Sequence, residues 1–156
     1  MTPETFASLI GGLTATIAGR ALDAQLQDDL NARIGAGSEL FARIRGACEA
    51  AIAAGWMCNR EGGGIRYGRV IKAGPATHGF SVDVVDMQDL AGPHHVHPNG
   101  EIDMVMPVSP QAKFDGHGAG WCVYGPASAH RPTVTGGRAL VLYLLPGGAI
   151  QFTPPG

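Results

Sequence analysis

The hydrophobic period of the chain changes near Trp56, and this change restricts the fold more than any other feature. Beyond that residue the apolar side chains fall in short segments, among them "IRYGRVIK", "FSVDVVDM", "EIDMVMP", "WCVYGP" and "ALVLYLLP". The segments are rich in β-branched and aromatic residues and are bounded by Gly, Pro or Asp, which is typical of strands joined by turns. Several such strands with no helix between them predict an antiparallel sandwich or a small barrel.

Residues 1–55 show helical spacing instead. Thr2 precedes Pro3, which is a favourable start for a first helix, and Ser38 is placed to cap a later one. The apolar residues that recur every three or four positions are Phe6, Leu9, Ile10, Leu13, Ile17, Leu22, Leu26, Leu30, Ile34, Leu40, Phe41, Ile44, Cys48 and Ile52. We expect about three helices here, packed on a β-barrel that occupies residues 56–156.

Composition excludes several classes of protein. At 156 residues the chain is long enough for one domain with its own core. Charged residues make up 15% and the formal net charge is −2, and no Lys/Arg cluster is present to neutralise the phosphates of a nucleic acid. No apolar run approaches the roughly 18 residues of a membrane span, and no secretory signal is evident. The three widely spaced cysteines indicate reduced thiols, so we expect a cytoplasmic protein that binds neither nucleic acid nor membrane.

The stretch "GPHHVHPNGEID" contains the strongest candidate for a functional site. Side chains alternate along a strand, so His95 and His97 share a face and His94 points the other way. The turn residues "PNG" are expected to reverse the chain and set Glu101 across from the histidines on a paired strand. Two imidazoles and a carboxylate on one face form a site for a divalent metal ion. His130, which follows another strand and a turn, is the natural fourth ligand.

The spacing His-x-His-x-x-x-Glu, with a further His about 30 residues on, resembles the metal signature of the cupins. The resemblance covers roughly residues 60–152. It departs from the cupin pattern at Asp89 and Val108, where glycines are usual, and at "GPASAH", where Pro-x-Gly-x-x-His is usual. It implies a cupin-type antiparallel β-barrel, the double-stranded β-helix. The metal ligands that it implies are His95, His97, Glu101 and His130.

These ligands suit Fe, Mn or Zn better than Ca or Mg, because imidazole favours the transition metals. The alternative is a site without metal, in which a hairpin carries solvated or hydrogen-bonded histidines.

Longer stretches resemble a more specific family. The segments "GWMCNREGGGIRYGRVIKAGP", "GPHHVHPNGEIDMVMP" and "FDGHGAGWCVYGPASAHRPTVTGGRALVLYLLPGGAI" are similar to a small bacterial family of 4-hydroxylaminobenzoate lyases, over nearly the full chain. The resemblance implies conversion of 4-hydroxylaminobenzoate and water to 3,4-dihydroxybenzoate and ammonia, in the degradation of nitroaromatic compounds. Loss of the N–OH oxygen as water needs a general acid or a Lewis acid, and water must then add to the ring and hydrolyse an imine.

This chemistry assigns expected roles to several residues. For proton transfer we expect Glu101 to act, with His117 or Tyr124 as a proton shuttle. The substrate carboxylate needs a cation, and the ring needs an apolar wall. The substrate-binding residues that we expect are Arg66, Arg131, Trp121 and Tyr67.

Two alternative functions belong to different classes. The first is a metal-dependent cupin dioxygenase acting on a small aromatic compound, which would consume oxygen during turnover. The second is a non-catalytic cupin that binds a small ligand, although no DNA-binding or signalling segment accompanies the barrel. For the lyase we expect a small aromatic acid as substrate and a homodimer, since the apolar helices can supply an interface.

Overall fold

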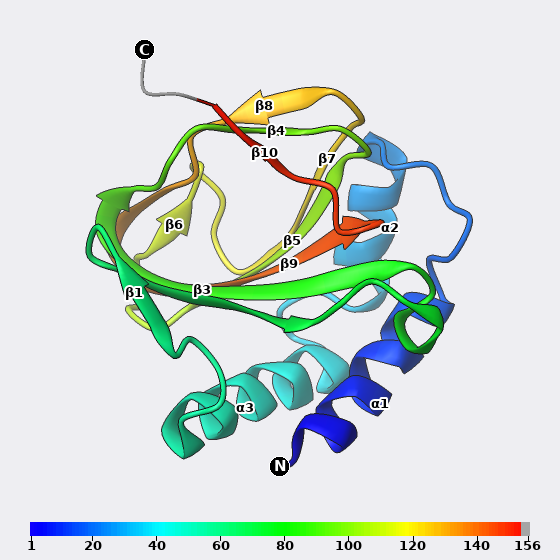
Figure 1. The fold of residues 1–156 in the computed structure, drawn as a ribbon, viewed down its shortest axis with the longest axis horizontal. Coiled ribbons are helices and arrows are strands. Elements are labelled where there is room, and N and C mark those ends of the chain that lie inside the picture. Colours follow the sequence, from blue (N-terminus) through cyan, green and yellow to red (C-terminus); the bar gives the residue numbers. More distant parts are fainter. Residues whose placement is uncertain (154–156) are drawn as a thin grey trace.

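Three α-helices precede the strands in the computed structural model, which describes residues 1–153 (Figure 1). The helices are α1 (Pro3–Ala15), α2 (Ala24–Arg33) and α3 (Glu39–Ala54), and a short 3-10 turn, η1, spans Pro75–Thr77. At the start of each α-helix a side-chain oxygen accepts a backbone hydrogen bond; the three capping residues are Thr2, Asp23 and Ser38. None of the helices in this part of the chain combines the length and apolarity needed to cross a membrane.

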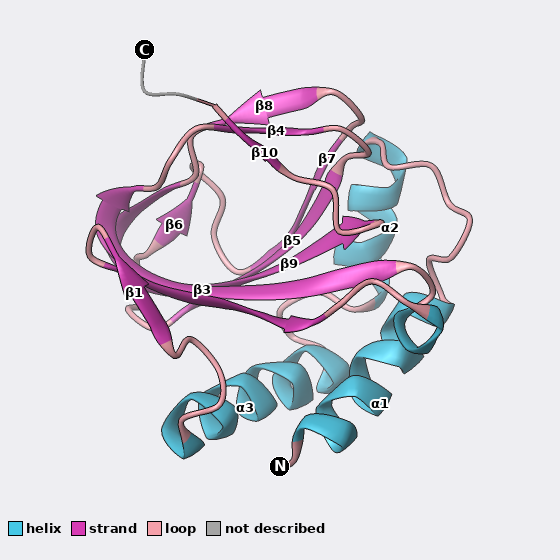
Figure 2. Cartoon of the chain, viewed as in Figure 1, coloured by secondary structure: helices cyan, strands magenta, loops and turns pink. Residues whose placement is uncertain are grey.

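The strands form two antiparallel sheets (Figure 2). Their bounds are β1 Arg60–Gly62, β2 Ile65–Ile71, β3 Phe80–Ala91, β4 His95–His97, β5 Glu101–Pro107, β6 Lys113–Phe114, β7 Gly120–Tyr124, β8 Ser128–His130, β9 Thr133–Pro146 and β10 Gln151–Phe152. The larger sheet has the order β1-β2-β3-β9-β5-β7, with β6 paired to β9, and the smaller sheet has the order β10-β4-β8. The smaller sheet lies across from the curved larger sheet. The predicted fold class, mainly β and cupin-type with an N-terminal helical segment, is confirmed.

Successive side chains along each strand of the larger sheet point to opposite faces, and both faces of the sheet are buried. On the outer face, residues such as Val84 and Leu142 share one core cluster with Phe6 and Ile44 from the helices, so α1 and α3 pack directly on the sheet (Figure 1). The inner face carries a second cluster that includes Val141 and looks toward the smaller sheet. The candidate functional residues project from this inner face and from the smaller sheet.

Helix α2 covers the open edge of β7, the last strand of the larger sheet. The Asn31 side chain donates to the carbonyl oxygen of Trp121 at 2.9 Å and accepts from its backbone N–H at 2.8 Å. One helical turn earlier, Gln27 accepts from the backbone N–H of Val123 at 2.8 Å. These amides satisfy backbone groups that a further strand would otherwise pair.

Replacing Asn31 with Ala is expected to lower the free energy of unfolding by about 1–3 kcal/mol, because two backbone groups of Trp121 lose their partners. Urea denaturation followed by circular dichroism measures the change. Asp28→Ala is the matched control, since Asp28 is an exposed residue of the same helix. Equal stability of the two variants would show that solvent satisfies this edge as well as Asn31 does.

Candidate metal centre and its cavity

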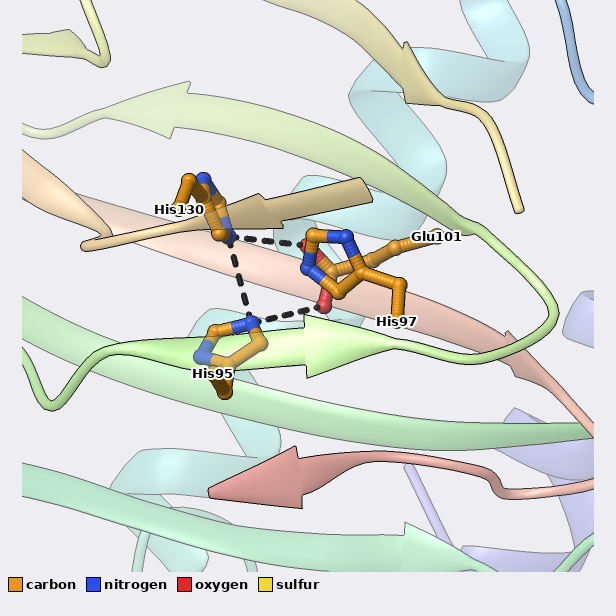
Figure 3. Close-up of side chains that lie close together, drawn as sticks. All are labelled: His95, His97, Glu101 and His130. Carbon is orange, nitrogen blue, oxygen red and sulfur yellow. Dashed lines mark hydrogen bonds and ion pairs between the residues drawn. The ribbon is translucent and has the colours of Figure 1, made fainter. Parts of the chain in front are cut away.

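The smaller sheet supplies three of the four predicted metal ligands. His95 and His97 lie on one face of β4, and both side chains are buried. His130 lies in β8, directly opposite His95 in the register of the sheet. Figure 3 shows the three imidazole rings gathered around the carboxylate of Glu101.

Glu101 reaches the histidines from the other sheet. Strand β4 pairs with β8 and β10, whereas β5, which begins at Glu101, pairs with β7 and β9. The expectation of a paired strand after the "PNG" turn is therefore wrong. The turn carries the chain from one sheet to the other, and Gly100 has a φ of 87° where an added Cβ would lie 2.7 Å from the Tyr124 carbonyl oxygen. As a result, the carboxylate faces the imidazoles across the interior.

The candidate ligand atoms of these four side chains all lie within 4.8 Å of one another. Oε1 of Glu101 lies 3.5 Å from Nε2 of His95. Oε2 of Glu101 lies 3.2 Å from Nε2 of His97 and 3.4 Å from Nε2 of His130. The exposed fraction of the His130 side chain is 11% and that of the other three is at most 2%, so the cluster is almost closed to solvent.

Hydrogen bonds outside the cluster determine which ring nitrogen carries hydrogen in two of the histidines. Nδ1 of His95 lies 3.3 Å from the carbonyl oxygen of Pro93 and must donate to it, because a carbonyl only accepts. Nδ1 of His130 lies 2.5 Å from Oδ2 of Asp115 and donates to that carboxylate. In their neutral forms both rings therefore present a lone pair on Nε2 to the centre.

His97 follows the same pattern. The Ser128 hydroxyl donates to the carbonyl oxygen of Gly125, which leaves Ser128 Oγ to accept from Nδ1 of His97 at 3.0 Å. All three Nε2 atoms thus face the centre as acceptors or ligands. Nε2 of His130 lies 3.2 Å from Nε2 of His95, and two lone pairs at this distance require a proton or a metal ion between them.

The donor set fits a divalent metal ion. Within residues 1–153, Nε2 of His97 and both carboxylate oxygens of Glu101 are buried without a hydrogen-bond partner. Buried polar atoms of this kind are costly unless a bound group satisfies them. Three imidazoles and one carboxylate suit Fe, Mn or Zn. The four side chains that the sequence predicted as ligands are the ones that the fold brings together.

Burial and hydrogen bonding together set the charge of the cluster. Burial raises the pKa of Glu101, but the close approach of the His130, His95 and His97 imidazoles to its carboxylate outweighs burial and holds the pKa well below its ordinary value. Burial lowers the pKa of His130, but the carboxylates of Asp115 and Glu101 raise it to about 9. In the absence of a metal ion, the site therefore holds a carboxylate and a protonated imidazole at neutral pH.

Asp115 supports the cluster from a loop that the sequence analysis did not single out. Its Oδ2 accepts from His130 and, at 2.7 Å, from the Tyr124 hydroxyl, and its Oδ1 accepts from the backbone N–H of Thr133 at 2.9 Å. Of the two expected proton shuttles, Tyr124 lies beside the cluster, with its ring centroid 4.6 Å from that of His130, whereas His117 is exposed. No sequence pattern marks Asp115, because only the fold brings its loop to β8.

Asp103 is a second carboxylate next to the cluster. It lies two residues after Glu101 on the same face of β5 and is fully buried. Neither of its oxygens has a hydrogen-bond partner in the described chain. Burial, and then the negative charge of Glu101, raise the pKa of Asp103 well above its ordinary value.

A cavity of about 490 Å³ adjoins the cluster and shares His95 with it. Its lining is mainly apolar, and Tyr67, Tyr143 and Phe152 contribute aromatic rings. The Phe152 ring centroid lies 5.7 Å from that of His95, so the aromatic lining continues to the edge of the cluster. The size and lining of the cavity suit a single substituted aromatic ring.

Of the four expected substrate-binding residues, only Tyr67 lines this cavity. Trp121 lies in the core on the opposite face of the larger sheet, where its ring packs edge-on against Phe41. Arg66 precedes Tyr67 in β2, and by alternation its side chain projects away from the cavity. Arg131 is exposed and is not part of the lining. The structure therefore does not place these three side chains on the cavity, and their roles in substrate binding stay predictions.

Similarity to known proteins extends over nearly the whole chain. Residues 8–152 match the family model described as "PnbB: 4-hydroxylaminobenzoate lyase". A protein of Nocardioides sp. (strain LMS-CY) named 4-hydroxylaminobenzoate lyase is 37% identical, with 87% of each chain covered, and a protein of Pseudomonas putida with the same name is 30% identical, with 88% of each covered. A crystal structure of an RmlC-like cupin protein from Ralstonia eutropha JMP134 has a TM-score of 0.45 and 13% identity, covering 59% of this chain and 61% of that one.

Removal of one candidate ligand should empty the site. We expect His97→Ala to weaken metal binding by about 100-fold or more, because it removes an imidazole from the buried donor set. Elemental analysis of protein purified without a histidine tag measures the metal per chain. His94→Ala is the control, since His94 bonds Thr153 instead, with 2.6 Å between Nδ1 and Oγ1. Equal losses in the two variants would contradict the assignment of faces along β4.

Metal affinity should also depend on pH. His130 must lose its proton to ligate a metal, so below its pKa of about 9 we expect the affinity for Zn to rise by about tenfold per pH unit. Competition with a chelating dye between pH 6.5 and 8.5 measures this slope. Asp115→Asn removes the carboxylate that raises the pKa of His130 and should flatten the slope. An affinity independent of pH in the unaltered protein would exclude His130 as a ligand.

Proposed function

The chain belongs to the 4-hydroxylaminobenzoate lyase family, and we propose that it converts 4-hydroxylaminobenzoate and water to 3,4-dihydroxybenzoate and ammonia. The observation that carries the proposal is the meeting of three imidazoles and the Glu101 carboxylate at the edge of an aromatic-lined cavity. Such a site can exchange protons with a ring held beside it. The reaction follows the reduction of a nitro group to a hydroxylamine, and we place the protein in the degradation of nitroaromatic compounds.

The proposed reaction has three stages, and its atoms and charges balance. The N–OH group takes up a proton and its N–O bond breaks, so that water leaves with the bonding pair and the ring becomes electron-poor. Water then adds to the ring carbon next to the nitrogen-bearing carbon and loses a proton. A second water hydrolyses the resulting C=N bond, ammonia leaves, and the ring recovers its aromaticity as 3,4-dihydroxybenzoate. One water is released and two are consumed, and no external oxidant or reductant is needed.

His95, His97, Glu101 and His130 are the residues that would hold a divalent metal ion. When bound, such an ion supplies Lewis acidity, which favours departure of the N–OH oxygen. Its identity among Fe, Mn and Zn is part of the proposal. The imidazoles are already oriented for this role by their outer hydrogen bonds.

The protonation and burial of the other side chains in the site indicate their roles in the proposed reaction. Glu101, ionised at neutral pH, is suited to take a proton from attacking water. Asp103, whose pKa is raised by burial and by the charge of Glu101, lies two residues away on the same face. Tyr124 acts through Asp115, which holds His130 in place. His117, being exposed, has no part in this scheme.

Replacing Glu101 with Gln should lower kcat for ammonia release by about 100-fold or more, because the variant loses both a ligand and a proton acceptor. An enzyme-coupled ammonia assay, with chromatography of 3,4-dihydroxybenzoate, measures the change. Glu61→Gln is the matched control, since Glu61 is an exposed residue of β1. A fully active Glu101→Gln variant would remove Glu101 from the mechanism.

An oxygen electrode tests the alternatives on the same samples. The lyase should release one ammonia per substrate without oxygen uptake, and chelation followed by return of Fe, Mn or Zn should abolish and restore activity. Oxygen uptake without ammonia would favour a cupin dioxygenase. Tight binding of the aromatic acid with no turnover would favour a ligand-binding protein.

A further inference from the structure

We propose that Arg60 binds the carboxylate of the substrate and thereby directs the hydroxylamino end of the ring to the histidine cluster, an inference that rests on the proposed function. The cavity requires a cation for this purpose, because the apolar walls cannot compensate a buried carboxylate. Two arginines line the cavity, Arg60 and Arg69. They differ in whether their guanidinium groups are free to bind.

Strand register places Arg60 on the cavity side of the larger sheet. In the β1–β2 pair Arg60 lies opposite Tyr67, and in the β2–β3 pair Tyr67 lies opposite Val85. Residues directly opposite each other project from the same face of a sheet. Arg60, Tyr67 and Val85 therefore form one row on the inner face, and all three line the cavity.

Arg69 is already engaged. Its Nε lies 3.0 Å from Oδ1 of Asp83, and its terminal nitrogen lies 3.1 Å from Oδ2 of Asp83 and 3.3 Å from the carbonyl oxygen of Gly148. This bidentate pair cancels the charge that Arg69 would offer a ligand. Arg60, by contrast, has no carboxylate within ion-pair distance and no side-chain hydrogen bond in the described part of the chain. It is the lining cation with its donors available.

The positions of Arg60 and His95 in the cavity lining suggest how the two ends of the substrate are oriented. The hairpin formed by β1 and β2 packs against the segment before β4. Ile65 in β2 is the contacting residue, since a Cβ added to Gly92 would lie 3.4 Å from its Cδ1. Arg60 belongs to a strand of the larger sheet and His95 to a strand of the smaller sheet, and both line the cavity, whose lining is mainly apolar. In a 1,4-disubstituted benzene the two substituents lie at opposite ends of the ring. A carboxylate held by Arg60 consequently leaves the hydroxylamino group facing the cluster, and the same arrangement disfavours 2-substituted isomers.

Substrates with and without a carboxylate test the role of Arg60. For 4-hydroxylaminobenzoate, Arg60→Gln is expected to raise KM by about 10- to 100-fold, since a charge-assisted bidentate contact is lost, with a smaller change in kcat. For phenylhydroxylamine, which lacks the carboxylate, the variant and the unaltered protein should show the same kcat/KM. Arg43→Gln, which removes an exposed charge from α3, should leave both substrates unaffected.

Three outcomes would overturn the inference: an unchanged KM, an equal loss on both substrates, or a selective loss in Arg66→Gln but not in Arg60→Gln. Calorimetric titration with benzoate measures the contact without turnover, and Arg60→Gln should weaken that binding by a similar factor. If the unaltered protein released no ammonia, the lyase proposal would fail, while the benzoate titration would still decide whether Arg60 recognises a carboxylate.

Discussion

A carboxylate buried among three imidazoles is the constraint on which the rest of this structure depends. Glu101 has no exposed surface, and neither of its oxygens finds a hydrogen-bond donor in ordinary geometry within the described chain. Burying such a charge is unfavourable unless positive charge or a metal ion compensates it. The protonated state of His130 meets that need when no ion is bound, and an ion meets it when His130 is neutral. The cluster is therefore built for a cation in either state.

The surrounding architecture keeps this cluster in place. The helices occupy the outer face of the larger sheet and bury its apolar side chains there, which leaves the inner face free for polar groups and a cavity. Each imidazole is held by an oxygen behind it, from Pro93, Ser128 or Asp115, so the ring orientations do not depend on the ligand. A rigid donor set beside a hollow, apolar space is an arrangement that suits chemistry on one bound aromatic ring.

Strand alternation predicted more of this site than any other signal. It placed His95 and His97 on one face, because a period of two is a local property of the chain. Glu101 was expected from the turn that precedes it, and His130 from its position after a strand and a turn. Alternation does not reveal which face of a sheet is hollow or which distant strands pair. For that reason alternation could not tell that Trp121 and Arg66, which were expected at the substrate, project away from the cavity. Asp115 could not be predicted, since its contact with the cluster depends on a loop whose path is set by tertiary packing.

Three of the candidate ligands belong to the small sheet and one to the large sheet, and this division has a mechanical consequence. Strand β4 pairs only with the short strands β8 and β10, so local opening of the small sheet breaks few backbone hydrogen bonds. An ion shared by both sheets would act as a cross-link between them, and its release would accompany each opening. The rate at which one bound metal isotope exchanges for another would thus report how often the small sheet opens away from the large sheet.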